Sequence, residues 1–247
     1  MTTRSRIEWT EHTWNPVTGC TNVSPGCKHC YARVMAERLR AMHVAGYANG
    51  FSVTLQSGRL SEPLRRQKPT VYFVNSMSDL FHEQVPAVFI EQVFDVIHLT
   101  PQHRYQILTK RPKRMLEFFR KRRVPANAWM GVSVEDRKYG IPRIAMLRDI
   151  DATIRFLSIE PLLEALGEFD LTDIHWTIVG GESGPGARPM HVNWVRSIRD
   201  KCVAEGIPFF FKQWGVWGAD GQRRSKTANG RLLDGKLWSQ FPEQHLS

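Results

Sequence analysis

Short apolar runs separated by amphipathic segments repeat along most of the chain. The runs are rich in β-branched and aromatic residues and occupy residues 68–77, 104–110, 128–135, 152–160, 174–182 and 207–214. Continuous apolar runs of this length are typical of parallel strands that are buried on both faces. The segments between them place apolar residues at helical spacing, as in Val195, Ile198 and Cys202. This spacing predicts that Cys202 is a buried apolar residue.

The alternation of strands and helices predicts βαβ units and a parallel sheet. With one more strand near the N-terminus, the pattern predicts an α/β fold with a complete or partial (β/α) barrel, and a doubly wound open sheet is the alternative. The 247 residues suit one domain of this kind. We therefore expect a single barrel-like domain over residues 1–247, with an N-terminal cysteine loop at 14–31 and a C-terminal tail at 215–247 folded back on it.

Each predicted strand ends in polar residues. The active site of a parallel α/β sheet or barrel lies at the carboxyl ends of its strands, so we expect these residues to converge on one rim. A helix cap at Glu135 and a plain turn at Gly180 and Gly181 are the simpler interpretations. The rim candidates are Asn75, Ser76, Asp79, Ser133, Glu135, Glu160, Gly180, Gly181, Glu182 and Lys212.

The composition is that of a soluble globular protein, with 42% hydrophobic and 23% charged residues. No apolar run approaches the roughly 18 residues of a membrane span. Residues 1–14 lack the apolar stretch of a signal peptide. We therefore expect a cytoplasmic protein without membrane partners, in a compartment where clustered cysteines act as ligands more often than as disulfides.

The net charge of +10 is unevenly distributed along the chain. Residues 110–123 hold eight basic side chains and one acidic side chain, Glu117. Such a run predicts an anionic partner, and nucleic acid is the leading candidate. A solvated helix face explains the same run equally well.

Three of the four cysteines fall within eleven residues, at Cys20, Cys27 and Cys30. Thiolates are soft ligands that select zinc or iron–sulfur clusters. A structural zinc needs four ligands, so His12 or His29 would have to complete the set. A four-iron cluster held by three cysteines keeps one iron open for a substrate or cofactor. The spacing alone leaves both interpretations open.

The segment CKHCYA at residues 27–32 resembles the cluster loop of radical S-adenosylmethionine enzymes, in which C-x-x-C is followed by an aromatic residue and a helix. The resemblance implies a barrel of that family's type and a 4Fe-4S cluster on Cys20, Cys27 and Cys30. It also implies S-adenosylmethionine on the fourth iron and a reductant such as flavodoxin or ferredoxin. Six residues separate the first two cysteines, more than is usual in that family.

A second resemblance extends over about 200 residues. The chain is similar to a widespread phage and bacterial protein family without an established reaction, which is grouped with radical S-adenosylmethionine proteins by its cysteines. The shared motifs are WNPVTGC (14–20), SPGCKHCYA (24–32), FVNSMSDLFH (73–82), LTKRP (108–112), VGGESGPGARPM (179–190) and FFFKQWG (209–215).

The family resemblance assigns roles to the rim candidates. Gly180, Gly181 and Glu182 have the residue types that hold the methionine amino group in radical S-adenosylmethionine enzymes, but they follow a late strand. The earlier Asn75, Ser76 and Asp79 are therefore the candidates for the methionine end. Ser133 and Glu135 are candidates for the ribose, Glu160 is a further cofactor contact, and Glu182 and Lys212 would handle protons or contact phosphate.

These inferences predict an iron–sulfur enzyme that uses S-adenosylmethionine for radical chemistry on a nucleic-acid base or nucleoside, in modification or repair. The first alternative is a non-enzymatic nucleic-acid-binding protein with a structural zinc. The second is an iron–sulfur redox or sensor protein that binds no S-adenosylmethionine.

Overall fold

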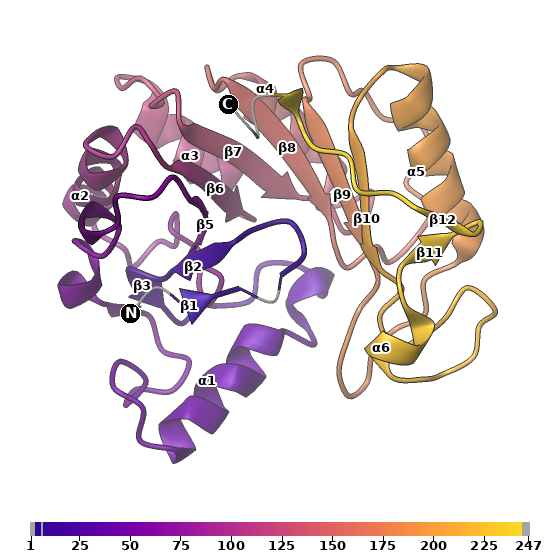
Figure 1. Cartoon of the computed structure of the whole chain (residues 1–247), viewed down its shortest axis with the longest axis horizontal. Helices are drawn as coiled ribbons and strands as arrows, with labels where there is room; N and C mark the ends of the chain where they lie inside the picture. Colours follow the sequence, from indigo (N-terminus) through magenta and orange to yellow (C-terminus); the bar gives the residue numbers. More distant parts are fainter. Residues whose placement is uncertain (1–2, 6, 244–247) are drawn as a thin grey trace. The chain divides into compact units, whose positions relative to one another are not determined.

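The structure is a computed structural model that describes residues 3–5 and 7–243. The chain forms two compact units, to which residues far apart in sequence contribute (Figure 1). The first unit comprises Met1–Val23, Cys30–Gly131 and Asp149–Thr153, and the second comprises Ser24–His29, Val132–Arg148 and Ile154–Ser247. Cys20 and Cys30 thus belong to the first unit and Cys27 to the second. That both units make up a single domain stays a prediction.

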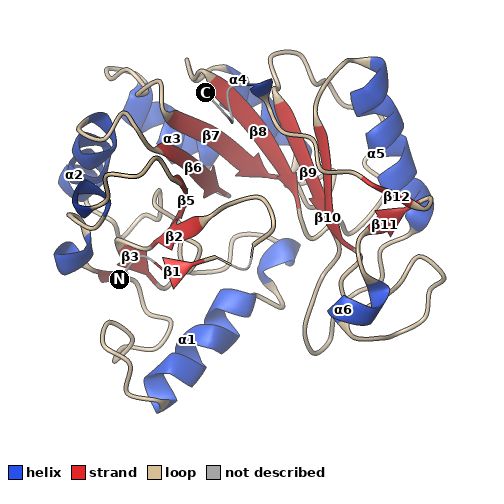
Figure 2. Ribbon diagram, viewed as in Figure 1, coloured by secondary structure: helices blue, strands red, loops and turns tan. Residues whose placement is uncertain are grey.

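One sheet holds the main strands in the order β1-β2-β5-β6-β7-β8-β9-β10 (Figure 2). The bounds are β1 Thr3–Arg4, β2 His12–Trp14, β5 Val71–Val74, β6 Arg104–Thr109, β7 Ala128–Ser133, β8 Ile154–Ile159, β9 Trp176–Gly180 and β10 Phe209–Gln213. Within the described residues, seven of these strands run parallel, and β1 pairs antiparallel to β2. The predicted partial (β/α) barrel is therefore confirmed as a half-barrel sheet.

The strand order also decides against the alternative fold. A doubly wound sheet reverses its strand order at a switch point, whereas here the order along the sheet follows the order along the chain. Each of the six predicted apolar runs contains one of the strands β5 to β10, and β2 is the extra strand near the N-terminus. The strand predictions are confirmed.

In the first unit, β2 pairs with β5 and β5 with β6, all in parallel. The helices are α1 Tyr31–Ala41, α2 Ala87–His98 and α3 Pro112–Phe119, with 3-10 turns at Ser57–Arg59 and Pro63–Arg65 and a small ribbon of β3 Val17–Thr18 and β4 Thr54–Leu55. Helices α2 and α3 meet through aromatic side chains, with the ring centroids of Phe94 and Phe119 4.9 Å apart. Burial of such aromatic residues stabilises the unit.

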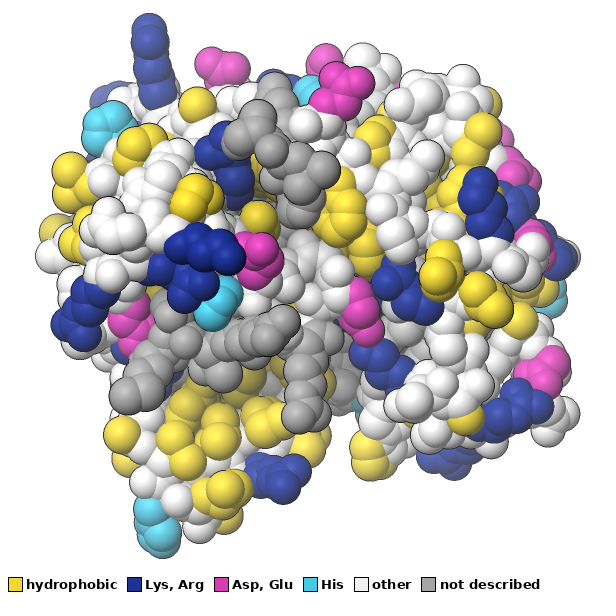
Figure 3. Space-filling model, viewed as in Figure 1, with side chains coloured by type: hydrophobic (Ala, Val, Ile, Leu, Met, Phe, Trp, Pro, Cys, Tyr) yellow, Lys and Arg dark blue, Asp and Glu magenta, His cyan; other side chains and the backbone are white. Residues whose placement is uncertain are grey.

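Helix α1 packs through its small residues. Ala32 and Ala36 are buried against Tyr47 and Phe51, and Cys20 and Cys30 pack on the edge of this cluster. Leu39 packs against the same cluster, whereas Tyr31, Val34 and Met35 are exposed, and Figure 3 shows apolar side chains over this helix. The small face of α1 therefore fixes two of the three clustered cysteines to the core of the first unit.

In the second unit, β8, β9 and β10 pair in parallel. The other elements are the 3-10 turn Pro25–Cys27, α4 Ile141–Arg148, α5 Val192–Ala204, α6 Lys226–Asn229, β11 Leu232–Leu233 and β12 Lys236–Leu237. Cys202 on α5 is fully buried, as predicted, and burial raises the pKa of its thiol to about 11. Among the described helices, none has the length and apolar character that crossing a bilayer demands.

The C-terminal segment packs on β9 and β10 within the second unit. The backbone nitrogen of Phe211 donates to the oxygen of Trp238 at 3.0 Å, and the indole of Trp176 donates to the oxygen of Gln240 at 2.9 Å. The ring of Phe241 lies 5.2 Å from that of Trp176. The described part of the tail therefore covers the sheet with apolar side chains. Residues 244–247 lie outside the described residues.

Candidate functional site

Asp79 organises the carboxyl end of β6 in the first unit. Its carboxylate accepts hydrogen bonds from the Thr109 hydroxyl at 2.7 Å and from the backbone nitrogens of Lys110 and Phe81 at 3.0 Å each. The Thr109 hydroxyl in turn accepts from the backbone nitrogen of Arg111 at 2.8 Å. These bonds fix the turn after β6 and determine where the Arg111 side chain leaves the backbone.

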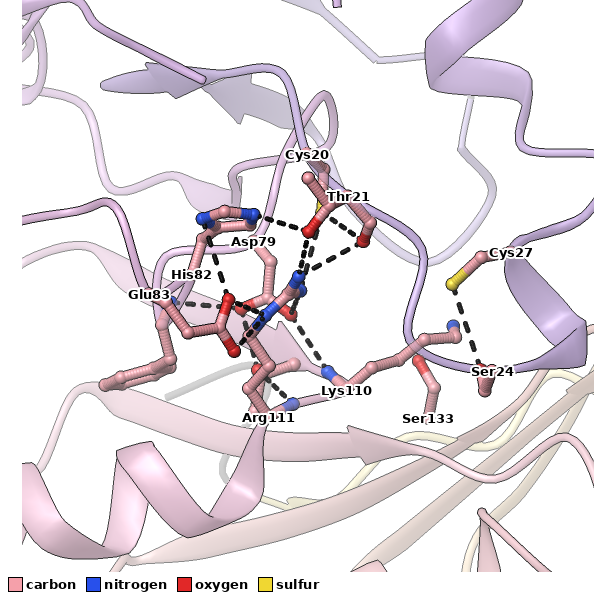
Figure 4. A network of polar contacts seen from close by, with 12 residues as sticks. Cys20, Thr21, Ser24, Cys27, Asp79, His82, Glu83, Lys110, Arg111 and Ser133 are labelled. Carbon is pink, nitrogen blue, oxygen red and sulfur yellow. Dashed lines mark hydrogen bonds and ion pairs between the residues drawn. The ribbon is translucent and has the colours of Figure 1, made fainter. Parts of the chain in front are cut away.

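The Arg111 guanidinium is buried and held from several sides (Figure 4). It donates from NH1 to Asp79 at 3.2 Å, from Nε to both carboxylate oxygens of Glu83 at 3.0 Å, and from NH2 to the backbone oxygen of Thr21 at 3.1 Å. NH1 also points at Cys20 Sγ, 3.5 Å away. A permanent positive charge is therefore fixed beside one of the three clustered cysteines.

The charges around Arg111 keep it protonated. Burial alone would lower the pKa of Arg111 and is the largest single effect, but the groups around it, with Asp79 first, together outweigh burial. Cys20 and Glu83 act in the same direction, so the pKa lies above its ordinary value. In the sequence, Arg111 is one of the eight basic residues of the run at 110–123 that predicts an anionic partner. With only 6% of the residue exposed, it is instead an internal group of the site.

His82 completes this network as a neutral side chain. Its Nδ1 accepts a hydrogen bond from the backbone nitrogen of Gln84 at 3.1 Å, so the ring proton belongs on Nε2, which donates to the Thr21 hydroxyl at 2.8 Å. Burial lowers the pKa of His82, and the nearby Arg111 charge lowers it further. His82 therefore orients Thr21, the residue next to Cys20.

The candidates for the methionine end also contact the cysteine loop. Asn75 adopts a left-handed backbone with φ 59°, and its Oδ1 accepts from the backbone nitrogen of Val17 at 3.2 Å. Its Nδ2 is buried and, among the described atoms, has no hydrogen-bond partner. The Ser76 hydroxyl donates to Asn15 Oδ1 at 3.2 Å. Asn75 and Ser76 thus position residues 14–20 at the end of β5.

In the second unit, Glu135 after β7 holds the short loop that carries Cys27. The Ser24 hydroxyl donates to the Glu135 carboxylate, and the same hydroxyl lies 3.8 Å from Cys27 Sγ. Glu135 is fully buried and pairs with Arg143 at 2.6 Å. Arg143 also donates to the backbone oxygen of Ser133 at 2.7 Å. The residues predicted to contact a ribose therefore form the support under the Cys27 loop.

Glu182 after β9 holds the same loop through an arginine. Arg188 donates to the Glu182 carboxylate from its backbone nitrogen, Nε and NH2 at 2.9, 2.9 and 2.6 Å, and from NH2 to the oxygen of Pro25 at 3.0 Å. Burial alone would raise the pKa of Glu182, but the hydrogen bonds from Arg188 outweigh burial and lower it. Glu182 is therefore a paired carboxylate at neutral pH.

Glu160 after β8 and Lys212 on β10 form a further ion pair on the second unit. Lys212 Nζ lies 2.9 and 3.0 Å from the two carboxylate oxygens, and Gln213 Nε2 donates to one of them at 3.0 Å. Gln213 Oε1 is buried without a hydrogen-bond partner among the described residues. This corner offers a cation, an anion and an unused acceptor side by side.

Of the two glycines at the end of β9, Gly181 is required by a close backbone contact and Gly180 lies tightly against a side chain. A Cβ on Gly181 would lie 2.0 Å from the backbone oxygen of Trp214, which no side chain can tolerate. A Cβ on Gly180 would lie 3.1 Å from the Glu160 carboxylate. The glycines therefore let β10 and Glu160 approach this strand end, which a turn alone would not require.

The basic segment 110–123 divides into internal and surface parts. Arg111 is buried, and Arg114 donates to the backbone oxygen of Val85. Arg122 pairs with Glu91 and lies over the Phe118 ring at 4.5 Å. The four cations at 120–123 are all exposed. Lys113 is exposed as well, so it shares with these four cations the solvent access that a phosphate-binding surface needs.

The three clustered cysteines are each partly exposed, and none of them is in a disulfide. In the part of the chain that the structure describes, no group of three or more His, Cys, Asp or Glu side chains is gathered as metal ligands are. Sequence reasoning missed that three arginines pair with the strand-end carboxylates. Arg111 and Arg188 lie within the quoted motifs LTKRP and VGGESGPGARPM, which is the signal that was present, whereas Arg143 had none.

The chain belongs to the family described as "Protein of unknown function (DUF5131)", whose sequence profile matches residues 4–242. No curated protein matches the sequence. Two solved structures of spore photoproduct lyase are similar to this chain. The first, with dinucleoside spore photoproduct, has a TM-score of 0.49 and 12% identity, and covers 81% of this chain and 63% of that one. A mutant with the same ligand has a TM-score of 0.47, 14% identity and the same coverage. The chain therefore spans 63% of the length of these structures.

Proposed function

We propose that this member of the family is an iron–sulfur enzyme that uses S-adenosylmethionine for radical chemistry, with Cys20, Cys27 and Cys30 as the ligands of a 4Fe-4S cluster. The observation that carries the proposal is the set of dedicated contacts around two of the three clustered cysteines, none of which is in a disulfide. Cys20 faces the Arg111 guanidinium at 3.5 Å, and the Cys27 loop is fastened to Glu135 through Ser24. Cysteines without a role as ligands would not need buried ion pairs that fix their positions.

The donor set fits such a cluster. Thiolates are the usual ligands of iron–sulfur clusters, and none of the three cysteines is in a disulfide. Cys30 is the N-cap of α1, and its side chain makes no capping hydrogen bond. The positive end of the helix dipole favours an anionic ligand there. The sulfur of Cys30 is thus placed to bind a metal centre.

A structural zinc is less well supported, because the two histidines that would complete it are engaged elsewhere. His12 lies within β2, and its ring centroid is 6.0 Å from that of Tyr72. The ring of His29 packs against Gly186, where a Cβ would lie 2.9 Å from His29 Cε1. The contacts of both rings favour a three-cysteine centre with an open position over a closed four-ligand site.

A bound, reduced cluster supplies the electron that cleaves S-adenosylmethionine, and it needs a reductant such as flavodoxin or ferredoxin. The protein supplies binding and orientation. Asn75 Nδ2 is a buried donor without a partner among the described atoms, which suits the carboxylate at the methionine end. Ser76 and Asp79 would support it from the same loop. Gln213 Oε1 is a matching acceptor on the second unit, suited to an amino or hydroxyl group.

The remaining rim residues divide between support and chemistry. Glu135 and Glu182 hold the Cys27 loop, and Ser133 stays the candidate for a ribose hydroxyl. Lys212 is paired with Glu160, and its side chain is 15% exposed. Once a ligand binds at Glu160 in place of Lys212, the Lys212 ammonium would donate a hydrogen bond to a phosphate or a proton to a leaving group. Gly180 and Gly181 stay candidates for a cofactor contact through their backbone, since the space beside them is taken by Glu160 and the end of β10.

The enzyme proposal is tested by product formation. Protein reconstituted with iron and sulfide under anaerobic conditions and then reduced should cleave S-adenosylmethionine to 5′-deoxyadenosine and methionine, measured by chromatography and mass spectrometry. The matched control is the Cys27→Ser variant carried through the same reconstitution. A full, reduced cluster that gives no 5′-deoxyadenosine would favour the redox or sensor protein, and colourless protein with one zinc would favour the zinc protein.

The substrate class we propose is a nucleic-acid base or nucleoside, supported by the exposed cations at 120–123. Each phosphate contact releases a condensed counterion, so three or four contacts give a log–log salt slope of roughly −2 to −4. Neutralising all four cations should flatten this slope and weaken binding about equally for every sequence, because phosphate contacts do not read bases.

The salt experiment is checked by fluorescence anisotropy with a labelled oligonucleotide. Neutralising four other exposed cations serves as the control for net charge: Arg223, Arg224, Lys226 and Lys236. An equal effect of both sets would mean that only net charge matters. An unchanged salt slope in the variant at 120–123 would mean that these cations bind no phosphate and form only a solvated surface.

A further inference from the structure

The Arg111 guanidinium directs an N–H group at the sulfur of Cys20. All three of its nitrogens are engaged: Nε with Glu83, NH2 with Thr21, and NH1 with both Asp79 at 3.2 Å and Cys20 Sγ at 3.5 Å. The planar fork has five N–H groups in a rigid arrangement. Because its other partners fix the plane, the direction of the N–H group toward the sulfur is fixed as well.

The ion pair of Arg111 and Asp79 beside this contact is buried. The side chains of Arg111 and Asp79 are 5% and 8% exposed. Placing a charge this deep costs free energy that a surface arginine avoids, and pairing only partly offsets it. A surface lysine paired with Glu83 would stabilise the same turn without burying a positive charge. The burial of a fork beside Cys20 therefore points to a role at the sulfur.

We propose that Arg111 is a positioning residue that sets the reduction potential of the cluster through its hydrogen bond to the ligand sulfur of Cys20, an inference that rests on the proposed function. Hydrogen bonds to cluster sulfurs and the local charge are two of the factors that set such potentials. An N–H group pointing at the sulfur stabilises the reduced, more negative cluster. Arg111 therefore makes the cluster easier to reduce.

The two carboxylates determine which part of Arg111 matters most. Asp79 and Glu83 carry two negative charges against the single positive charge of Arg111. The group as a whole therefore does not present a net positive charge to the cluster. The directed hydrogen bond, more than the charge of the group, is what favours reduction. This distinction can be tested, because lysine keeps the charge but lacks the fork.

The test is a potentiometric titration of the reconstituted full chain, followed by electron paramagnetic resonance of the reduced cluster. Arg111→Lys should shift the ratio of reduced to oxidised cluster at a fixed potential about tenfold toward the oxidised form, which is about 59 mV for one electron. Arg111→Met should shift it further in the same direction, because it also leaves Asp79 and Glu83 without their cation. Arg114→Met is the matched control on α3. It should leave the ratio of reduced to oxidised cluster within about twofold of the wild type, well below the tenfold change expected for Arg111→Lys.

The outcomes separate this inference from the proposed function. A wild-type protein that binds no iron overturns both. A wild-type cluster with normal cleavage of S-adenosylmethionine, together with an Arg111→Lys variant of unchanged midpoint potential, overturns the role of Arg111 alone. Should Arg111→Met fail to fold, Arg111→Lys still decides, since its ammonium can pair with the buried Asp79.

Discussion

Replacing Cys20, Cys27 or Cys30 with alanine, one at a time, should each remove most of the iron from the reconstituted protein. Thiolate ligands have no substitute in this loop, and even groups that only orient a metal ligand are worth 10–100-fold in affinity. We therefore expect each variant to lose about 100-fold or more in iron affinity, measured as iron and sulfide per chain after desalting.

Cys202→Ala is the matched control for this series. Cys202 is fully buried on α5, and the pKa of its thiol is raised to about 11 by burial, so it stays protonated and unable to bind metal at neutral pH. The variant should keep the wild-type iron content. Loss of iron from Cys202→Ala in a protein that still folds would mean a fourth protein ligand, and the open iron required for S-adenosylmethionine would then be lost.

The strands could be predicted from sequence because burial on both faces leaves a continuous apolar run. Residues 128–133 are buried at every position of β7, and the run AWMGVS contains no charged residue. The partial barrel follows from the same signal, since helical segments follow most of the strands, although the described residues between β8 and β9 form no helix. The division into two units could not be predicted, because it depends on which segments contact each other and not on local pattern.

The strand-end residues were predicted by type and position, but their partners were not. Asp79, Glu135 and Glu182 pair with arginines that lie 32, 8 and 6 positions along the chain. The periodicity of apolar residues predicts at which end of a strand a carboxylate lies, but it does not predict which cation pairs with that carboxylate. The sequence pattern indicated carboxylates that contact a ligand at the rim, and the structure pairs three of them with arginines beside the two cysteine segments.

This pairing changes what a strand-end carboxylate does. Asp79 and Glu83 orient Arg111 toward Cys20, and Glu135 and Glu182 hold residues 24–29, which carry Cys27. A group that holds a loop affects chemistry only through the geometry of that loop. Variants of these residues should thus act on iron binding and stability before they act on turnover.

Glu135→Ala should lower the free energy of unfolding by about 3–5 kcal/mol, because it leaves the Arg143 guanidinium buried and unpaired. The side chains of Glu135 and Arg143 are 0% and 7% exposed and lie 2.6 Å apart, so water cannot replace the lost partner. The same change removes the acceptor of the Ser24 hydroxyl, and the Cys27 loop should become more open to proteases. Urea denaturation followed by tryptophan fluorescence measures the first effect, and limited proteolysis measures the second.

Two further variants make the result specific to the buried pair. Glu164→Ala removes an exposed partner of Arg137 at 3.5 Å and should cost less than about 1 kcal/mol, as surface pairs do. Glu135→Ala combined with Arg143→Met removes both charges and should recover much of the lost stability, because the penalty comes from the unpaired cation. Equal losses in Glu135→Ala and Glu164→Ala would contradict the support that Glu135 gives to the Cys27 loop. A double variant no more stable than Glu135→Ala would instead assign the loss to the Ser24 hydrogen bond and the cavity left by the side chain.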